Sequence, residues 1–154
     1  MNKNGKYITL KPDEQTKAHL VCLIDKLNLD NPVKENDLHI TLIYSKEITK
    51  EANNYKINQS KYTVNAAHFD LYGDNKDHLV IVINSEDLHE KHNNLKNNGF
   101  QHSYKKHNPH ITIAFNTSKI PVDTLLKELS NEELVFEKEQ VHDINKKTKP
   151  KNRP

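Results

Sequence analysis

The chain has 154 residues but one cysteine, three glycines and no tryptophan. A lone cysteine, Cys22, excludes an intrachain disulfide, and its apolar neighbours indicate a small buried side chain. No apolar run approaches the roughly 18 residues that a membrane-spanning helix needs, and the N-terminus lacks a signal-peptide core. We therefore expect a protein of the reducing cytoplasm, with no membrane partner.

Several classes of site are also missing from the sequence. The three glycines are scattered, so there is no glycine-rich phosphate loop, and no Gly-x-Ser-x-Gly elbow is present. His89 and His92 lie three residues apart, but no cysteine pair or acidic cluster completes a metal site. A net charge of +2 provides no global field for duplex DNA. We expect no metal, no cofactor and no duplex DNA partner, and a monomer or weak oligomer.

The apolar pattern nevertheless predicts regular structure, although hydrophobic residues make up only 34% of the chain. Ser85 is expected to cap a helix that stops at Gly99. The segment 46–60 is expected to be a polar connection. Residues 145–154 are basic and contain prolines, so we expect a disordered tail after a single domain of residues 1–144. Strands are predicted at 7–10, 38–44, 61–71, 78–83, 109–115 and 133–141, and helices at 13–28, 85–98 and 121–129.

One arrangement occurs twice along the chain. A strand, a helix, a loop and a His-Ile-Thr strand follow one another in residues 7–44 and again in residues 79–115. This self-similarity indicates an internal duplication, with two lobes related by a pseudo-twofold axis. We expect an α+β fold whose antiparallel sheets line a central cleft, with helices outside.

The two His-Ile-Thr motifs are the strongest chemical signal in the sequence. In a strand, residues i and i+2 point to the same face, so each motif presents an imidazole and a hydroxyl together. One histidine can remove a proton from an attacking hydroxyl while the other protonates the leaving oxygen. The threonines can bind the phosphoryl oxygens. The candidate catalytic residues are His39, Thr41, His110 and Thr112; the sequence leaves open which histidine is the base.

The segments DLHITLIYS (37–45) and NPHITIAF (108–115) resemble the two-histidine phosphoesterase superfamily, which has the LigT-like or 2H fold. Within it, the chain is most similar to the phage anti-CBASS nucleases. This resemblance implies a metal-independent phosphodiesterase that cuts the 3′-5′ linkages of cyclic di- and trinucleotides such as cGAMP. Such an enzyme would act in the cytosol of an infected bacterium and so evade CBASS immunity.

The same resemblance implies further substrate-binding residues. NGKYITL supplies Tyr7, and VFEKEQV supplies a late acid, Glu137 or Glu139. Strand alternation places both glutamates on one face, and Glu139 is slightly preferred. In the loop 102–107, Tyr104 is a candidate for stacking on a base and Lys105 or Lys106 for contacting phosphate.

Other interpretations stay open at this point. The chain also fits an RNA 2′,3′-cyclic phosphodiesterase or an enzyme that processes 2′,5′-linked RNA. A nucleotide-binding module without catalysis has no need for two proton-transfer groups, which counts against it. Non-specific RNA binding through the basic tail is a further alternative. For the aromatic residues Tyr44, Phe69 and Tyr72, core packing is favoured over base stacking, and His68, His78 and His142 have no motif around them.

Overall fold

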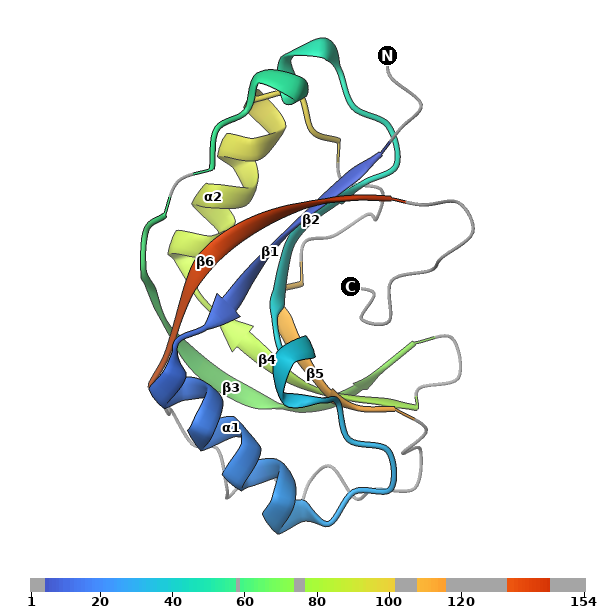
Figure 1. Ribbon diagram of the computed structural model, residues 1–154, viewed down its shortest axis with the longest axis vertical. Helices are drawn as coiled ribbons and strands as arrows, with labels where there is room; N and C mark the ends of the chain where they lie inside the picture. The colour runs from blue at the N-terminus through green and yellow to red at the C-terminus, as the bar shows by residue number, and fades with distance from the viewer. Residues whose placement is uncertain (1–4, 58, 74–76, 102–107, 116–132, 145–154) are drawn as a thin grey trace.

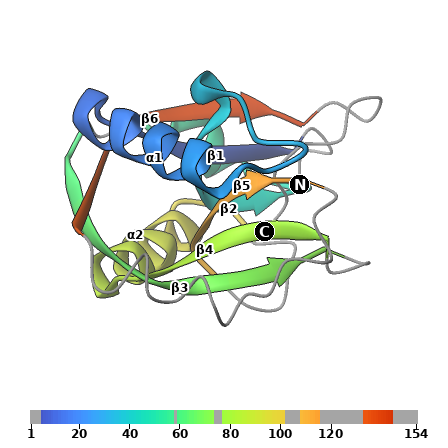
Figure 2. The same cartoon turned by 90° about the horizontal axis from the view of Figure 1, so that it is seen from below.

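The computed structural model describes residues 5–57, 59–73, 77–101, 108–115 and 133–144. In both views the two α-helices lie to the same side of the strands (Figure 1, Figure 2). The predicted helix 121–129 and the predicted tail 145–154 lie outside the described residues. The elements are β1 (Lys6–Pro12), α1 (Glu14–Leu27), the 3₁₀ helix η1 (Glu35–Asp37), β2 (Ile40–Ser45), the 3₁₀ helix η2 (Lys50–Asn54), β3 (Tyr62–Tyr72), β4 (His78–Asn84), α2 (Glu86–Asn97), β5 (His110–Ala114) and β6 (Glu133–Asp143).

The strands form a closed antiparallel barrel in the order β1-β2-β5-β4-β3-β6. The α+β fold with antiparallel strands and external helices is therefore confirmed. The two expected sheets are joined at both edges: β2 pairs with β5 at Ile40 and Ile111, and β3 pairs with β6 over Tyr62–Asn65. Because β3 and β6 are 11 residues long, each is able to pair with two neighbours along its length.

The strand order is symmetric about the junction of β2 and β5. Moving outward from that junction, β2, β1 and β6 on one side match β5, β4 and β3 on the other. The chain order strand, helix, strand is the same for β1-α1-β2 and β4-α2-β5. This symmetry is what an internal duplication produces, and it places the two His-Ile-Thr strands next to each other.

Local sequence fixes the ends of both helices. Asp13 and Ser85 have extended backbones, and their side chains accept hydrogen bonds from the amides of Thr16 and Leu88. After α2, Gly99 has a φ of 98°. A Cβ on Gly99 would meet the Thr49 hydroxyl, so this turn requires glycine. The predicted cap at Ser85 and stop at Gly99 are confirmed.

Each strand has one face toward the helices and one away from them. On β1, Ile8 and Leu10 belong to the same buried cluster as Leu20 of α1 and Leu88 of α2. We call this the helix face. The opposite face, which carries Tyr7, Thr9 and Lys11 on β1, is called the site face because both histidine motifs turn out to lie on it.

Two expectations about burial are wrong. Cys22 is exposed, because the buried stripe of α1 passes through Leu20, Leu23 and Ile24 and leaves position 22 outside it. The segment 46–60 is more than a polar connection, since it contains η2 and buries Ile48. Among the described residues, no helix is long and apolar enough to cross a lipid bilayer.

Candidate active site

The register of the central strands brings the two motifs together. Ile40 of β2 pairs with Ile111 of β5 in antiparallel orientation. One step along each strand, His39 therefore lies opposite Thr112, and Thr41 lies opposite His110. Directly opposite residues point to the same face, with Cβ atoms about 4.5–5.5 Å apart, and diagonal neighbours are about 7–8 Å apart. The two histidines and two threonines thus form a crossed square on the site face, with the histidines on one diagonal.

Both imidazoles are held in the same way. Nδ1 of His39 lies 2.7 Å from the carbonyl oxygen of Asp37, and Nδ1 of His110 lies 2.7 Å from that of Asn108. A carbonyl can only accept a hydrogen bond, so each Nδ1 carries the proton and donates it. The neutral ring then has its lone pair on Nε2, the nitrogen on the far side of the ring. Two residues 71 apart in sequence therefore share one tautomer and one anchor.

His39 favours the neutral form. Burial lowers the pKa of His39 to about 4, against the opposing effect of its hydrogen bond to the Asp37 carbonyl. The charges of Lys11, His142 and His110 lower this pKa further, which also indicates that these groups lie near His39. A histidine that is neutral at physiological pH is suited to accept a proton.

The two threonines and His110 are almost fully enclosed. Thr41, Thr112 and His110 are 8%, 2% and 5% exposed. Within the site, the edge of Tyr72 contacts the His110 ring, with the ring centres 4.9 Å apart. Tyr72 was expected in the core, but it belongs to the site face and limits the rotation of the His110 ring.

Strand β1 supplies three side chains beside the His39 motif. Thr9 pairs with Thr41, and the register between Leu10 and Ile40 places Lys11 opposite His39. Lys11 donates a hydrogen bond of 2.8 Å to the Asn36 carbonyl, next to the motif. Tyr7, predicted from the sequence, lies on this same face two residues before Thr9. Sequence reasoning missed Thr9 and Lys11, although both alternate with the buried Ile8 and Leu10.

The two candidate glutamates point in different directions. Lys138 has a φ of 55°, and between the pairs Thr9–Gln140 and Lys11–Glu137 strand β6 has one residue too many. This β-bulge reverses the alternation. Glu137 stays on the site face opposite Lys11, whereas Glu139 turns to the helix face. The expectation that the two glutamates share a face is therefore wrong, and the structure does not bring Glu139 to the other site residues.

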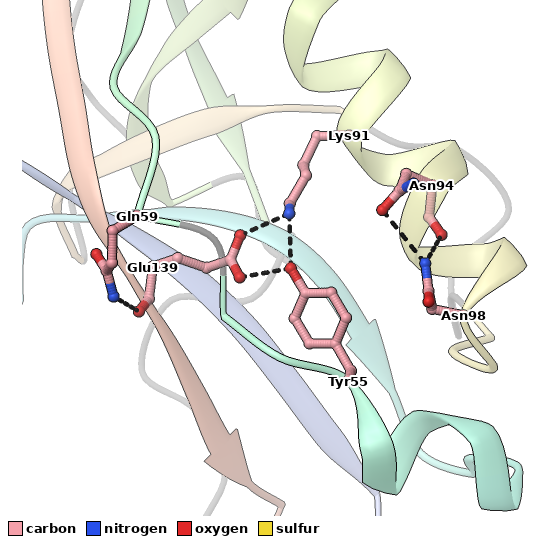
Figure 3. A network of polar contacts seen from close by, with 6 residues as sticks. All are labelled: Tyr55, Gln59, Lys91, Asn94, Asn98 and Glu139. Atoms are coloured by element: carbon pink, nitrogen blue, oxygen red, sulfur yellow. Dashed lines mark hydrogen bonds and ion pairs between the residues drawn. The ribbon is translucent and has the colours of Figure 1, made fainter.

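Glu139 instead belongs to a buried polar network (Figure 3). Its carboxylate accepts a 2.5 Å hydrogen bond from the Tyr55 hydroxyl and lies 2.9 Å from Nζ of Lys91. Lys91 also donates to the Tyr55 hydroxyl at 2.6 Å. Burial and the bond to Glu139 raise the pKa of Tyr55. The network therefore links α2, β6 and the segment after η2.

The remaining candidates from the sequence are the residues of the loop 102–107 and the possible metal ligand His92. Tyr104, Lys105 and Lys106 lie outside the described residues. His92 is buried in α2, and its Nδ1 lies 2.7 Å from the carbonyl oxygen of Leu42, at a bulge where β2 departs from regular pairing with β1. Within the described ranges, no group of three or more histidine, cysteine, aspartate or glutamate side chains is arranged to hold a metal ion.

The fold is that of the LigT-like phosphoesterases. Escherichia coli LigT bound to ATP superimposes with a TM-score of 0.59 at 14% identity, covering 92% of this chain and 88% of LigT. A protein of Thermus thermophilus gives a TM-score of 0.58 at 15% identity, covering 89% of this chain and 83% of its own. These likenesses establish the fold class, which is that of LigT.

The sequence places the chain more narrowly within that class. The profile of the family described as "Anti-CBASS protein Acb1" matches residues 4–151, and the chain belongs to this family. The Acb1 protein of Vibrio phage KVP40 is 26% identical over 124 residues, covering 79% of this chain and 80% of that protein. The Acb1 protein of Enterobacteria phage T4 is 27% identical over 118 residues, covering 75% of each.

Proposed function

We propose that this protein is a phosphodiesterase that cuts the 3′-5′ linkages of cyclic di- and trinucleotides in the cytosol of an infected bacterium. The observation that carries the proposal is the crossed square of His39, Thr41, His110 and Thr112. Two imidazoles that are anchored in the same way and lie on one diagonal are suited to act on opposite sides of a phosphodiester. Membership of the Acb1 family supports a cyclic oligonucleotide as the substrate, since that family acts against CBASS.

The proposed reaction is an internal transfer. The ribose 2′-hydroxyl attacks the neighbouring phosphorus, forming the O2′–P bond and breaking the bond from phosphorus to the 5′-oxygen. One histidine removes the proton of the 2′-hydroxyl while the other protonates the leaving 5′-oxygen. The products are an opened chain with a 2′,3′-cyclic phosphate and a free 5′-hydroxyl. Water then opens the cyclic phosphate, with the histidine roles exchanged. Because imidazoles perform both proton transfers, this scheme needs no metal ion.

The histidine environments favour one assignment for the first step. His39 is held neutral by burial and by the nearby charge of Lys11, so it is the proposed base. His110 is then the acid, and its ring packs edge to face against Tyr72. Thr41 and Thr112 donate hydrogen bonds to the non-bridging oxygens, where charge develops in the transition state.

The pH dependence of kcat/KM tests the assignment of the base. A general base must be neutral, and the pKa of His39 is lowered to about 4. The rate should therefore not fall on the acid side until pH approaches about 4, whereas an unperturbed histidine would begin to lose activity near pH 6.5. Substituting Lys11→Met removes a charge that disfavours protonation of His39 and should move the acid limb to higher pH. If the rate of the unsubstituted protein instead falls near pH 6.5, a group other than His39 is the general base.

Removing the threonine hydroxyls should have an intermediate effect. Thr41→Val and Thr112→Val keep the size of the side chain but delete one donor to the reacting phosphate. We expect kcat to fall by about 10²- to 10³-fold for each, as for the loss of one oxyanion donor. Thr41→Ser and Thr112→Ser are the matched controls and should retain most of the rate. Equal kinetics for the valine and serine variants would exclude the hydroxyls from catalysis.

Substrate profiling separates this proposal from the RNA-processing alternative. Purified protein is incubated with 3′,3′-cyclic dinucleotides, cyclic trinucleotides, 2′,3′-cyclic mononucleotides and 2′,5′-linked RNA, and the products are identified by mass spectrometry. We expect linear products from the cyclic di- and trinucleotides at the highest kcat/KM. If only RNA ends or 2′,5′ linkages are turned over, the protein is an RNA-processing enzyme and the proposal is wrong.

A further inference from the structure

A third histidine lies on the site face and has no place in the mechanism so far. Its Nε2 is 3.0 Å from the hydroxyl oxygen of Thr9, and its ring stacks on Tyr7 with the ring centres 4.6 Å apart and the planes at 20°. This residue, His142, pairs with Tyr7 across β1 and β6. The bulge at Lys138 decides the face on which it lies, because without that extra residue His142 would point toward the helices.

Thr9, the hydrogen-bond partner of His142, is placed beside the catalytic square. Thr9 is 2% exposed and lies directly opposite Thr41. Across β1, β2 and β5 the hydroxyls of Thr9 and Thr41 and the imidazole of His110 therefore lie in one row on the same face. A phosphate held between the two catalytic histidines would lie over β2 and β5, next to Thr41, and Thr9 is the neighbour of Thr41 on the adjacent strand.

A threonine hydroxyl is a rotor with one hydrogen to donate, and its partner decides where that hydrogen points. When Nε2 of His142 carries a proton and donates it to Thr9, the hydroxyl hydrogen of Thr9 is directed elsewhere on the site face. Stacking on Tyr7 fixes the ring plane of His142, so this direction is held before substrate arrives.

We propose that His142 is a positioning residue, which orients Thr9 as a third hydroxyl donor to the phosphate alongside Thr41 and Thr112. This inference rests on the proposed function. Among the described residues, Tyr7 stacks on the His142 ring, and the charged groups that act on the site around it include Lys11 of β1 and His39. Burial, and then the charge of Lys11, lower the pKa of His142, so the neutral ring does the positioning at physiological pH.

Three variants test the positioning role. His142→Phe keeps a ring against Tyr7 but removes the hydrogen bond, whereas His142→Gln keeps an amide donor for Thr9. We expect kcat on a 3′,3′-cyclic dinucleotide to fall about tenfold in His142→Phe, the kinetic equivalent of one hydrogen bond. His142→Gln should recover most of that loss. Thr9→Val should lower kcat by a similar factor, with Thr9→Ser close to the unsubstituted protein.

The double variant decides whether His142 acts through Thr9. If it does, His142→Phe combined with Thr9→Val should be no slower than either single variant. Multiplicative losses, or a His142→Phe kcat within twofold of the unsubstituted protein, would overturn the inference. Melting temperatures are compared for every variant. If His142→Phe does not fold, Thr9→Val tests the inference, because it leaves the stack of His142 on Tyr7 in place, and an unchanged kcat in Thr9→Val would overturn it.

The outcome can be told apart from failure of the proposed function. If the unsubstituted protein turns over cyclic dinucleotides and loses this activity in His110→Ala, the proposed function stands. Normal kcat in His142→Phe then overturns the positioning role alone. If the unsubstituted protein leaves every cyclic dinucleotide intact, the proposed function itself fails first.

Discussion

Replacing either motif histidine by alanine should lower kcat on a cyclic dinucleotide by about 10²- to 10⁴-fold, the usual contribution of one general acid or base. His39→Ala removes the proposed proton acceptor and His110→Ala the proposed donor. KM should change less, since the proposed phosphate donors Thr41 and Thr112 remain in place. Steady-state kinetics, with circular dichroism to confirm folding, measure the effect.

The matched control is an exposed histidine far from the motifs. His89 is exposed on α2, so His89→Ala should leave kcat unchanged. Because the two histidines act as a pair, the double variant His39→Ala/His110→Ala should have a kcat only slightly below that of the slower single variant. Turnover within tenfold of the unsubstituted protein in either single variant would contradict acid–base catalysis by this pair.

The second large effect concerns stability and comes from the buried network of Lys91, Glu139 and Tyr55. The side chains of Lys91 and Glu139 are 8% and 0% exposed. Lys91→Met leaves the Glu139 carboxylate buried without its cation, which costs about 3–5 kcal/mol. For a chain of this size the melting temperature should fall by roughly 6–20 °C, at about 2–4 °C for each kcal/mol.

A double substitution separates the charge effect from a packing effect. Lys91→Met together with Glu139→Leu removes both charges and should restore much of the lost stability, as replacement of a buried ion pair by apolar residues often does. Lys17→Met is the surface control, because Lys17 pairs with Glu14, whose side chain is 78% exposed, and little change is expected. A Lys91→Met variant as stable as the unsubstituted protein would show that the pair contributes nothing.

The parts of the fold that depend on local sequence could be predicted. The His-Ile-Thr strands, the cap at Ser85 and the helix stop at Gly99 depend on short patterns and backbone preferences. The repeat of strand, helix and motif indicated that the two histidine strands belong together. The arrangement in which each histidine lies opposite a threonine could not be predicted. It depends on the pairing register of β2 and β5, and the sequence of a single strand does not reveal that register.

The unpredicted features all depend on contacts between distant segments. The bulge at Lys138 moves Glu139 to the helix face. The alternating sequence pattern of β6 gives no sign that the strand contains an additional residue there. The hydrogen bond between His142 and Thr9 spans 133 residues, so neither position suggests the other. Lys91 is buried only because Glu139 and Tyr55 meet it, while its helical pattern resembles a solvated face.

One measurement tests the central claim that two imidazoles cut the linkage by internal attack without a metal. The protein is incubated in EDTA with a 3′,3′-cyclic dinucleotide and with its analogue lacking both 2′-hydroxyls, and the products are identified by mass spectrometry. The two-histidine mechanism predicts a linear product ending in a 2′,3′-cyclic phosphate from the first and an intact second compound. Cleavage of the deoxy analogue at a similar rate, or complete loss of cleavage in EDTA, would contradict it.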